Sequence, residues 1–525
     1  MKKTTTLLLM ILLHINLKSQ SIVGENLNIN NINARIYSAG YLFGDAGQAQ
    51  FEAPQGTGQG TIFAGNLWIG GLDQSNILHL GAQTYRQSGS DFFQGPIMYQ
   101  QSYTQSQDSL WNKLWKINKS TIDSFKLGLF FIPPQSLIEW PANGDTSKGQ
   151  LQKLAPYFDA NNDGFYNPFD GDYPEIRGDQ SIYFIYNDDR NIHAESGSNK
   201  MGVEIHGIAY AYECDDSAFF NTIFFHYDFI NRSNNNYHDT KIGVWTDFDN
   251  GCYLDDYIGT DSLMNTMYVY NGASQDAGCI GSNNYGMHPP AQSVSALNSS
   301  ISTTMFYDNS STYYGNPFNE SDYDGYLNGM WKNASHLTFG GTGTNGNAPT
   351  NFMYSGDPVS NTGWTESNAG NNPGDRRGIA SFEAFDFLSG EVKPFDIAYV
   401  FARDFQGTNV SAVSVLKQRI QQINTAFANG ISPCGGVFST TSISEEQNEH
   451  DKTIVYPNPS SGKFIIKNIE PGNQIKIFDS VGKVVYESKN VNTEIEVDMA
   501  KYSKGIYVIK IVDNCKSISK KVIIQ

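Results

Sequence analysis

Cysteine is scarce in this chain, which limits what can hold the fold together covalently. The 525 residues include five cysteines, at positions 214, 252, 279, 434 and 515. Five are too few for a disulfide scaffold of this length, and the odd number leaves at least one cysteine unpaired or paired outside the chain. Cys252 and Cys279 flank one compact Gly- and Asp-rich segment, so we expect a bridge between them in an oxidising compartment.

Long apolar runs are also lacking. The N-terminal run, residues 7–13, follows Lys2 and Lys3 and precedes a more polar stretch that ends at Gln20. This order is typical of a signal peptide, so residues 1–20 are predicted to direct export and to be removed. No later segment approaches the roughly 20 consecutive apolar residues that a membrane helix needs, so we expect no transmembrane segment.

Basic residues are few outside the C-terminal stretch. Residues 21–452 contain 21 Lys and Arg against 46 Asp and Glu, whereas residues 453–525 contain 11 against seven. This break predicts two functional units. An acidic body does not suit nucleic acid, whose phosphates require a basic face, so no nucleic-acid partner is expected. The acidity fits cation binding, and it equally fits the simpler role of keeping an exported protein soluble.

Glycine and aromatic residues are plentiful, and polar turn residues interrupt nearly every apolar run. With 50 Gly and 13% aromatics, the chain favours short strands over long amphipathic helices. We therefore predict a mostly β fold, with a large β-rich extracellular body over residues 21–438. Residues 218–231 and 237–247 are predicted to form a hairpin across an Asn-rich turn, and residues 202–212 predict a third antiparallel strand beside them.

One helix is predicted late in the body, and it is expected to pack on an edge of the β structure. Apolar residues recur there at helical spacing, and Gly430 follows as a stop signal: Val410, Val413, Leu416, Ile420, Ile423 and Phe427. Residues 439–452 are polar and then acidic, which is typical of a linker and marks a domain boundary. Residues 292–347, rich in Ser, Asn, Thr and Gly, predict a long set of surface loops.

The remaining residues, 453–525, form a regular series of short segments. Seven segments alternate between apolar and polar residues, and turns separate them. This pattern predicts seven short strands in a small immunoglobulin-like β-sandwich, with one face of each strand in the core. Pro457 and Pro459 have no N–H for a sheet ladder, so they are expected where the first strand leaves the sheet.

Several separated motifs in this module carry a family resemblance. In order, they comprise Tyr456, Pro457, Asn458, Pro459, Gly462, Phe464, Ile477, Phe478, Asp479, Gly482, Val484, Val485, Gly505, Ile506 and Tyr507. The module resembles the type A C-terminal sorting domain of the type IX secretion system. The resemblance implies passage through the outer-membrane translocon of that system. It also implies a cell-surface sortase, which removes the domain and can join the new C-terminus to an anionic lipopolysaccharide.

The expected location is therefore the cell surface or the extracellular medium. The alternative for this module is an immunoglobulin-like unit used for binding or spacing. The body is similar to large uncharacterised exported proteins of Bacteroidetes-type bacteria, through segments such as NLWIGGLD and DANNDGFYNPFDGDYP. That likeness implies no function for it.

The sharpest local motif of the body is the segment DANNDGFYNPFD, residues 159–170. Positions 1, 3, 5, 7, 9 and 12 of a calcium loop are filled here by Asp159, Asn161, Asp163, Phe165, Asn167 and Asp170. Gly164 at position 6 allows the sharp turn that brings their oxygens together. The pattern predicts a structural calcium site, resembling the isolated loops of dockerins and thrombospondin repeats. An Asx-rich turn that holds no metal is the alternative.

Other candidate ligands are weaker. Two acidic clusters fit no standard calcium loop, so solvated acidic turns are the preferred interpretation. The first cluster comprises Asp247, Asp249, Asp255, Asp256 and Asp261, and the second comprises Asp322 and Asp324 beside Gly325. A further set lies close in sequence: His193, Glu195, Glu204 and His206. Glu204 and His206 fall on one face of a predicted strand beside aromatics, so satisfied or solvent-facing side chains are preferred over metal ligands.

Familiar catalytic motifs are missing from the sequence. It contains neither H-E-x-x-H nor G-x-S-x-G, which argues against zinc proteases and α/β-hydrolases. A carboxylate pair for glycoside hydrolysis leaves no spacing signature. The 7 Trp and 30 Tyr offer surfaces for sugar stacking, although aromatics mostly fill cores.

We expect the body to be a calcium-stabilised adhesion or glycan-binding module. The alternative is a secreted hydrolase that acts on polysaccharide or protein. A pocket of converging carboxylates would favour the enzyme, and a flat or grooved face with aligned aromatics would favour binding.

Overall fold

The structure is a computed structural model and falls into two compact units, Met1–Thr440 and Thr441–Gln525. It describes residues 22–45, 48–86, 89–279, 284–435, 438, 454–458, 460–467, 469, 471–472, 474–479, 483–489, 492–512 and 517–524. Within these residues the fold is mostly β, as predicted. The predicted signal peptide and the predicted linker, residues 439–452, lie outside the described residues.

The first sheet of the body is antiparallel and nine-stranded. Its order is β1 (Gly24–Leu27), β2 (Asn33–Tyr37), β5 (Phe51–Glu52), β6 (Gly60–Leu72), β15 (Tyr237–Phe248), β22 (Arg376–Phe382) and β21 (Ile301–Tyr307). Two further strands extend it, with β7 (Leu78–Gly81) on β6 and β23 (Phe385–Phe387) on β15.

The second sheet is also antiparallel and nine-stranded. Its order is β16 (Asp256–Asp261), β17 (Thr266–Asn271), β20 (Ala291–Ala296), β24 (Val392–Ala402), β14 (Thr222–Asn231), β13 (Val203–Ala211), β12 (Gln180–Asn187) and β8 (Phe93–Gln94), with β9 (Trp115–Asn118) on β12. Three small ribbons pair β3 (Gly44–Asp45) with β4 (Gln48–Ala49), β10 (Tyr157–Phe158) with β11 (Tyr173–Pro174), and β18 (Gln275–Asp276) with β19 (Gly286–Met287).

Helices occupy the connections. The α-helices are α1 (Gln105–Trp111), α2 (Lys119–Lys126), α3 (Gln135–Ile138), α4 (Glu320–Leu327) and α5 (Asn409–Asn429). Short 3-10 turns are η1 (Gln100–Ser102), η2 (Thr146–Lys148), η3 (Pro168–Asp170), η4 (Phe219–Asn221) and η5 (Ser262–Met264).

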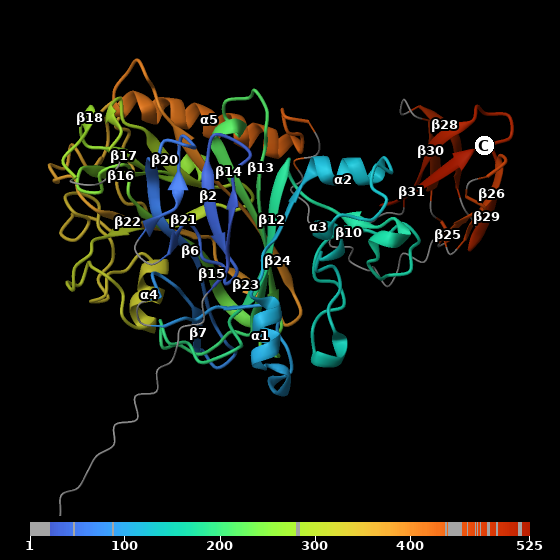
Figure 1. Cartoon of the computed structure of the whole chain (residues 1–525), viewed down its shortest axis with the longest axis horizontal. Helices are drawn as coiled ribbons and strands as arrows, with labels where there is room; N and C mark the ends of the chain where they lie inside the picture. The colour runs from blue at the N-terminus through green and yellow to red at the C-terminus, as the bar shows by residue number, and fades with distance from the viewer. Residues whose placement is uncertain are drawn as a thin grey trace, which may run out of the picture. The chain divides into compact units, whose positions relative to one another are not determined.

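The second sheet is buried on both of its faces. In β14, Phe225 belongs to the core that also contains Trp68 of the first sheet. The preceding Phe224 belongs to a second core, which contains Leu416 and Ile420 of α5. Because successive side chains of a strand point to opposite faces, a strand covered on both sides is apolar without interruption. The body is therefore a β-sandwich with α5 across one outer face (Figure 1).

Helix α5 forms where the spacing predicts it. The Thr408 side chain accepts the Ser411 N–H at its start, and Gly430 ends it in the left-handed conformation, with φ of 68°. The expected position on an edge of the body is wrong. The helix packs on β24, β20 and β17, and both β24 and β20 lie in the interior of the second sheet.

The predicted three-stranded unit forms only in part. β13 and β14 pair antiparallel, with Ile205 opposite Phe229. The predicted hairpin of β14 and β15 is wrong, because β15 belongs to the first sheet. Asn231, at the end of β14, donates from Nδ2 to the carbonyl oxygens of Asn235 (2.9 Å) and Phe387 (3.0 Å), and so fixes the turn that changes sheets. Alternation identifies the buried faces of strands but not their neighbours.

Residues 292–347 are not a set of surface loops. They contain most of β20, all of β21 and α4, and buried side chains that include Trp331. Small hydroxyl side chains in these strands bond inside the fold: Thr304 Oγ1 lies 2.8 Å from that of Thr260, and Ser295 Oγ lies 2.7 Å from Thr266 Oγ1. The polar composition was misleading because buried hydroxyls are tolerated once they are hydrogen-bonded.

Two disulfides cross-link the body. Cys252 and Cys279 form the predicted bridge. The second bridge, which the sequence did not predict, joins Cys214, after β13, to Cys434, after α5. Phe438 is buried beyond it and packs edge-on against Phe224 and other rings. Cys515 lies outside the described residues.

The C-terminal unit contains the seven predicted strands in two antiparallel sheets. One has the order β25 (Ile454–Tyr456), β26 (Lys463–Lys467) and β29 (Glu494–Asp498), and the other β28 (Val484–Lys489), β27 (Gln474–Phe478), β30 (Gly505–Val512) and β31 (Ser517–Ile524). Alternate side chains such as Phe464, Ile477 and Ile509 fill one core between them. β25 ends directly before Pro457, as expected, and Pro459 lies outside the described residues.

Candidate functional site

An open pocket of about 490 Å³ is lined by residues at the end of β15 and the start of β22. The loop after β7 supplies Tyr85, the loop after β12 supplies Glu195, and the segment before α4 supplies Phe318. Its volume falls in the range of small-ligand sites, about 300–1,000 Å³. Because its walls come from segments far apart in the sequence, no linear motif marks it.

Three carboxylates meet in this pocket. One oxygen from each of Asp247, Asp249 and Asp375 lies within 4.8 Å of the other two. Asp247 is 2% exposed, and Asp249 and Asp375 are half-buried. The expectation of solvated acidic turns is therefore wrong for Asp247, and also for the fully buried Asp256.

Tyr85 and Arg377 hold the Asp247 carboxylate. The Tyr85 hydroxyl donates to Asp247 Oδ2 over 2.5 Å, and Arg377 Nε donates to the Tyr85 oxygen over 2.6 Å. Arg377 Nη1 lies 2.9 Å from Asp375 Oδ2, and Nη2 lies 3.6 Å from Asp247 Oδ2. The arginine thus balances one of the three carboxylates.

Burial raises the pKa values of this cluster. Desolvation raises the pKa of Asp247 to about 7, with Arg377 opposing the shift and Asp375 adding to it. Desolvation also raises the pKa of Asp249 well above its ordinary value, and the charges of Asp247 and Asp375 raise it further. Carboxyls that keep a proton near neutral pH are candidates for acid–base chemistry, and they bind cations in exchange for that proton.

Glu195 brings a fourth carboxyl to the same pocket. Its Oε1 accepts the Thr84 hydroxyl and the Tyr323 hydroxyl, the latter at 3.1 Å. Its Oε2 is buried and has no hydrogen-bond partner within the described part of the chain. Burial raises the pKa of Glu195, although the two hydroxyls act against this shift.

The other members of the predicted histidine and glutamate set do not line the pocket. The ring nitrogens of His193 bond to the carbonyl oxygens of Leu80 (2.7 Å) and Asp188 (2.9 Å). His206 Nε2 lies 2.7 Å from Glu204 Oε1. These side chains are satisfied inside the fold, which was the preferred interpretation.

Exposed aromatic side chains line the pocket beside amide groups. Phe318 is 62% exposed and Tyr253 is 41% exposed. Asn309 and Asn316 line the same cavity. The tryptophans do not contribute, because all seven are buried: Trp68, Trp111, Trp115, Trp140, Trp245, Trp331 and Trp364.

The first half of the predicted calcium loop forms a tight turn. Asp159 accepts the N–H groups of Asp163 (3.3 Å) and Gly164 (2.8 Å). Gly164 has φ of 81°, which other residues adopt with strain. The Asn161 side chain bonds to Asp163, and the Asp163 carboxylate accepts the Phe165 N–H over 2.8 Å. Positions 1, 3 and 5 are thus brought together.

The second half of the loop is arranged differently. Asn167 Nδ2 donates to Asp170 Oδ2 over 2.6 Å. The fully buried Asp172 holds the base of the loop by accepting the N–H groups of Ala160 (2.8 Å) and Asn167 (2.7 Å). In the described structure, the carboxylate oxygens of Asp159, Asp163 and Asp170, at positions 1, 5 and 12, do not all lie within 4.8 Å of one another.

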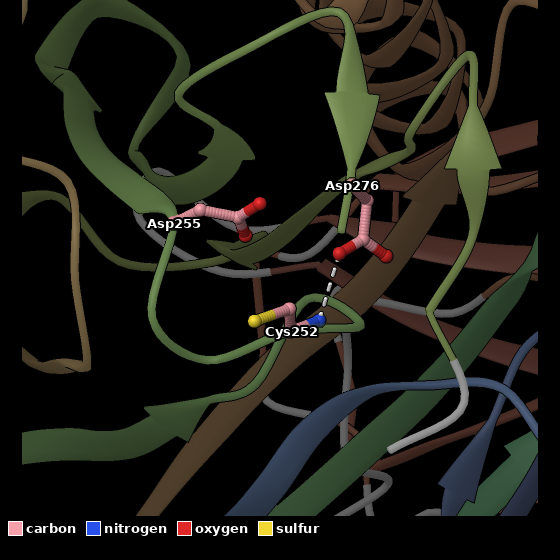
Figure 2. Close-up of side chains that lie close together, drawn as sticks. All are labelled: Cys252, Asp255 and Asp276. Carbon is pink, nitrogen blue, oxygen red and sulfur yellow. Dashed lines mark hydrogen bonds between the residues drawn. The ribbon is translucent and has the colours of Figure 1, made fainter. Parts of the chain in front are cut away.

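A second cluster of conceivable ligands is Cys252, Asp255 and Asp276 (Figure 2). The Cys252 sulfur is bonded to Cys279 and so offers no thiolate. Figure 2 shows the Asp276 carboxylate directed at the backbone of Cys252, whose N–H it accepts over 3.0 Å. Asp255 accepts from Asn271 Nδ2 over 2.8 Å. These carboxylates fasten the cross-linked loop to its neighbours.

The remaining acidic candidates have partners in the fold. Asp322 and Asp324 lie in helix α4, not in a turn. Asp322 accepts the Phe318 N–H over 2.9 Å, just before the helix begins. Asp261 lies 2.9 Å from Lys417 Nζ of α5.

The motif residues of the C-terminal unit have structural roles. Asn458 Oδ1 accepts the Ile523 N–H over 2.9 Å, which ties the segment after β25 to the last strand. Asp479 Oδ1 accepts the Lys483 N–H over 2.9 Å in the turn between β27 and β28. The buried Tyr507 donates its hydroxyl to the Ser503 carbonyl oxygen over 2.7 Å.

Gly462 is the motif glycine for which the structure gives the clearest reason. Its φ is 109°, and a Cβ there would lie 2.6 Å from Ala500 Cα. Residues 454–525 match the family model of the secretion system C-terminal sorting domain. The C-terminal unit is a type IX sorting domain. The sorting domain sends the chain through the type IX machinery across the outer membrane, to the cell surface or the extracellular space.

Among the described residues, no helix has both the length and the apolar content needed to cross a bilayer. Pro459 and Gly482 of the sorting motif lie outside the described residues. Comparison with curated proteins gives no match for the chain.

Solved structures resemble the chain only distantly. A polysaccharide lyase is 9% identical, with a TM-score of 0.21, over 67% of this chain and 37% of the lyase chain. PorZ, a surface component of the type IX system of Porphyromonas gingivalis, is 10% identical, with a TM-score of 0.14, over 95% of this chain and 75% of that one. The BSP domain of a biofilm associated protein is 9% identical, with a TM-score of 0.14, over 96% and 81%. Scores this low support no argument about the body.

Proposed function

We propose that the body, once exported, binds glycans in the pocket between β15, β22 and α4. The supporting observation is the pairing of exposed aromatic rings with polar groups in a cavity of ligand size. Phe318 and Tyr253 offer apolar faces on which the C–H face of a sugar ring can pack. Asn309 and Asn316 carry amide donors and acceptors that match sugar hydroxyls.

Hydrolysis of a polysaccharide is the second candidate, and the carboxylates favour it. The pKa of Asp247 is raised to about 7, so a large fraction of this carboxyl is protonated at neutral pH and can serve as a general acid. The separation of less than 4.8 Å between the cluster's oxygens is shorter than the about 6.5–9.5 Å of inverting glycosidases and nearer the about 5 Å of retaining ones.

We also propose that the loop of residues 159–170 binds a structural calcium ion. The Asp159, Asn161 and Asp163 oxygens already lie on one side of a turn with the φ at Gly164 that such loops require. Calcium binding requires Asp170 to exchange its hydrogen bond with Asn167 for the ion. The loop lies between β10 and β11, so the ion stabilises a local ribbon.

Attachment after export is proposed from the sorting domain alone. A cell-surface sortase removes the domain and joins the body to an anionic lipopolysaccharide, or releases it. Both outcomes leave the pocket outside the cell.

A glycan array with the purified chain tests the glycan proposal. We expect Phe318→Ala and Tyr253→Ala to weaken binding, because each removes one stacking face. Phe405→Ala is a matched control, since Phe405 is 60% exposed and lies outside the pocket. Binding that survives both pocket substitutions would place the glycan elsewhere.

Release of reducing ends from the bound glycans separates the two candidate functions. Retained, uncut glycan supports binding alone. Release that Asp247→Asn abolishes, with glycan binding preserved, supports hydrolysis.

A further inference from the structure

We propose that Asp247, Asp249 and Asp375 together bind a hard divalent cation in the pocket, with calcium as the expected ion. The cation site stands on its own geometry. Its further role, as the contact that holds sugar oxygens, rests on the proposed glycan-binding function.

The spacing of the three carboxylates fits a single ion. Oxygen ligands lie about 2.3–2.6 Å from calcium, so two ligands of one ion are separated by at most ~5 Å. The chosen oxygens of Asp247, Asp249 and Asp375 all lie within 4.8 Å of one another. A set of three carboxylates selects hard cations such as calcium, magnesium or manganese over softer metals.

Unpartnered atoms in the cluster point to a missing ligand. Arg377 contacts the Oδ2 atoms of Asp247 and Asp375. The Oδ1 atoms of these two residues are buried and have no hydrogen-bond partner within the described part of the chain. Asp247 as a whole is only 2% exposed. Buried acceptors without a partner are rare, and an ion is one of the groups that satisfies them.

The charge of the cluster matches a divalent ion. Three ionised carboxylates and one guanidinium leave two negative charges in a largely buried volume, and Glu195 lines the same pocket. A divalent cation carries the two positive charges that balance this excess.

The site is open on the pocket side. Three carboxylates fill three to six of the about six to eight positions that calcium takes, and the remaining positions are left for water or a ligand. Vicinal hydroxyls or a carboxylate of a sugar supply oxygens of the required kind. The exposed rings of Phe318 and Tyr253 line the same cavity, beside such a ligand.

Calorimetric titration of calcium into the chelator-treated full chain tests the proposal. Asp159→Ala and Asp163→Ala are introduced together first, because removing both oxygen ligands silences the loop of residues 159–170. We expect this chain to retain one calcium site, which adding Asp249→Asn weakens at least tenfold. Asp249 is the chosen position because no donor among the described residues bonds to its carboxylate, so an isosteric amide preserves the fold. Asp386→Asn, at an exposed position of β23, is the matched control and should leave the titration unchanged.

Two results would overturn the proposal. One is the absence of calcium binding in the chain with Asp159→Ala and Asp163→Ala up to ~10 mM, beyond the ~1 mM of weak extracellular sites. The other is a titration that Asp249→Asn does not alter. If near-UV circular dichroism shows that the Asp249→Asn chain is misfolded, Asp375→Asn takes its place with the same expectations.

The outcome for the glycan function is read separately. Calcium binding that depends on Asp249, without any glycan on the array, leaves the cation site in place and removes the glycan proposal. Glycan binding that resists chelator, in a chain without the calcium site, supports the glycan proposal and removes the cation site.

Discussion

Arg377 and Asp247 face each other across the antiparallel pair of β22 and β15, with Nη2 of the arginine 3.6 Å from Oδ2 of the aspartate. Both side chains are buried, at 6% and 2% exposure. The guanidinium restrains the rise in the pKa of Asp247 that burial causes. Because Arg377 also contacts Tyr85 and Asp375, the charge balance of the pocket depends on its guanidinium group.

We expect Arg377→Met to reduce the free energy of unfolding by about 3 kcal/mol, because it leaves buried carboxylates without a counter-charge. It should also raise the pKa of Asp247 further. Arg190→Met is the control, since its pair with Asp108 is partly exposed and should cost about 1 kcal/mol or less. Urea denaturation at neutral pH measures both, and equal losses would contradict the role given to Arg377.

The pKa of Asp247 predicts an unusual pH dependence in chelator-treated protein. A carboxyl with a pKa of about 7 in the folded chain and about 4 in the unfolded chain binds its proton more tightly when folded. Its contribution to stability is therefore full below about pH 4 and is lost as the pH rises to about 7, by at most about 1.4 kcal/mol per pH unit. Unfolding free energies measured across this window should fall less steeply in Asp247→Asn than in the unchanged chain. Identical slopes would show that Asp247 does not titrate there.

Calcium removal should open the loop of residues 159–170 before the rest of the body unfolds. With calcium, amide hydrogen exchange in this loop should be slow, and chelator should accelerate it. Asp159→Ala with Asp163→Ala should make exchange there fast in both conditions and remove the loop's share of the calcium-dependent rise in Tm. Asp249→Asn should leave the loop's response intact, which separates it from the pocket. A loop indifferent to chelator argues against the site.

Two glycines of the sorting domain offer a matched test of export. Gly462 and Gly472 both have positive φ, at 109° and 104°. A Cβ at Gly462 would lie 2.6 Å from Ala500 Cα, whereas a Cβ at Gly472 meets nothing within 4 Å. We expect Gly462→Ala to distort the domain and trap the chain in the periplasm, as deletion of residues 453–525 should. Gly472→Ala should export normally. Immunoblots of periplasm, cell surface and medium measure the export of each variant. Equal export of the two variants would show that the close contact between Gly462 and Ala500 is not required for sorting.

The sequence predicted the elements whose signals are local. Gly430 and the apolar spacing of α5 lie within one segment, as do the seven alternating strands of the sorting domain. The edge position of α5 and the pairing of β14 with β15 were wrong because they depend on neighbours elsewhere in the chain. The turn after Asn231 has an ordinary hairpin composition. The sheet to which each strand belongs is determined by its pairing partner, β24 for β14 and β6 for β15.

The pocket was hidden for the same reason. Asp247 and Asp249 stood out in the sequence, but Asp375, Arg377 and Tyr85 join them only because β15 pairs with β22 and the loop after β7 folds over that pair. The burial that raises the pKa of Asp247 is a property of the assembled sandwich. An acidic cluster next to the end of a buried strand is a sequence signal that favours a functional site. It does not indicate which residues elsewhere in the chain complete that site.

The covalent link between Cys434 and Cys214 also determines how the body responds to pulling. Tension applied to the chain beyond residue 438 reaches Cys434 and crosses the disulfide to Cys214, close to the end of β13. That strand is hydrogen-bonded on both sides, to β12 and β14. The load therefore enters the middle of the second sheet, and α5 is spared from being peeled off its face. A body held by its C-terminal end is thus anchored mechanically through an interior strand of the second sheet.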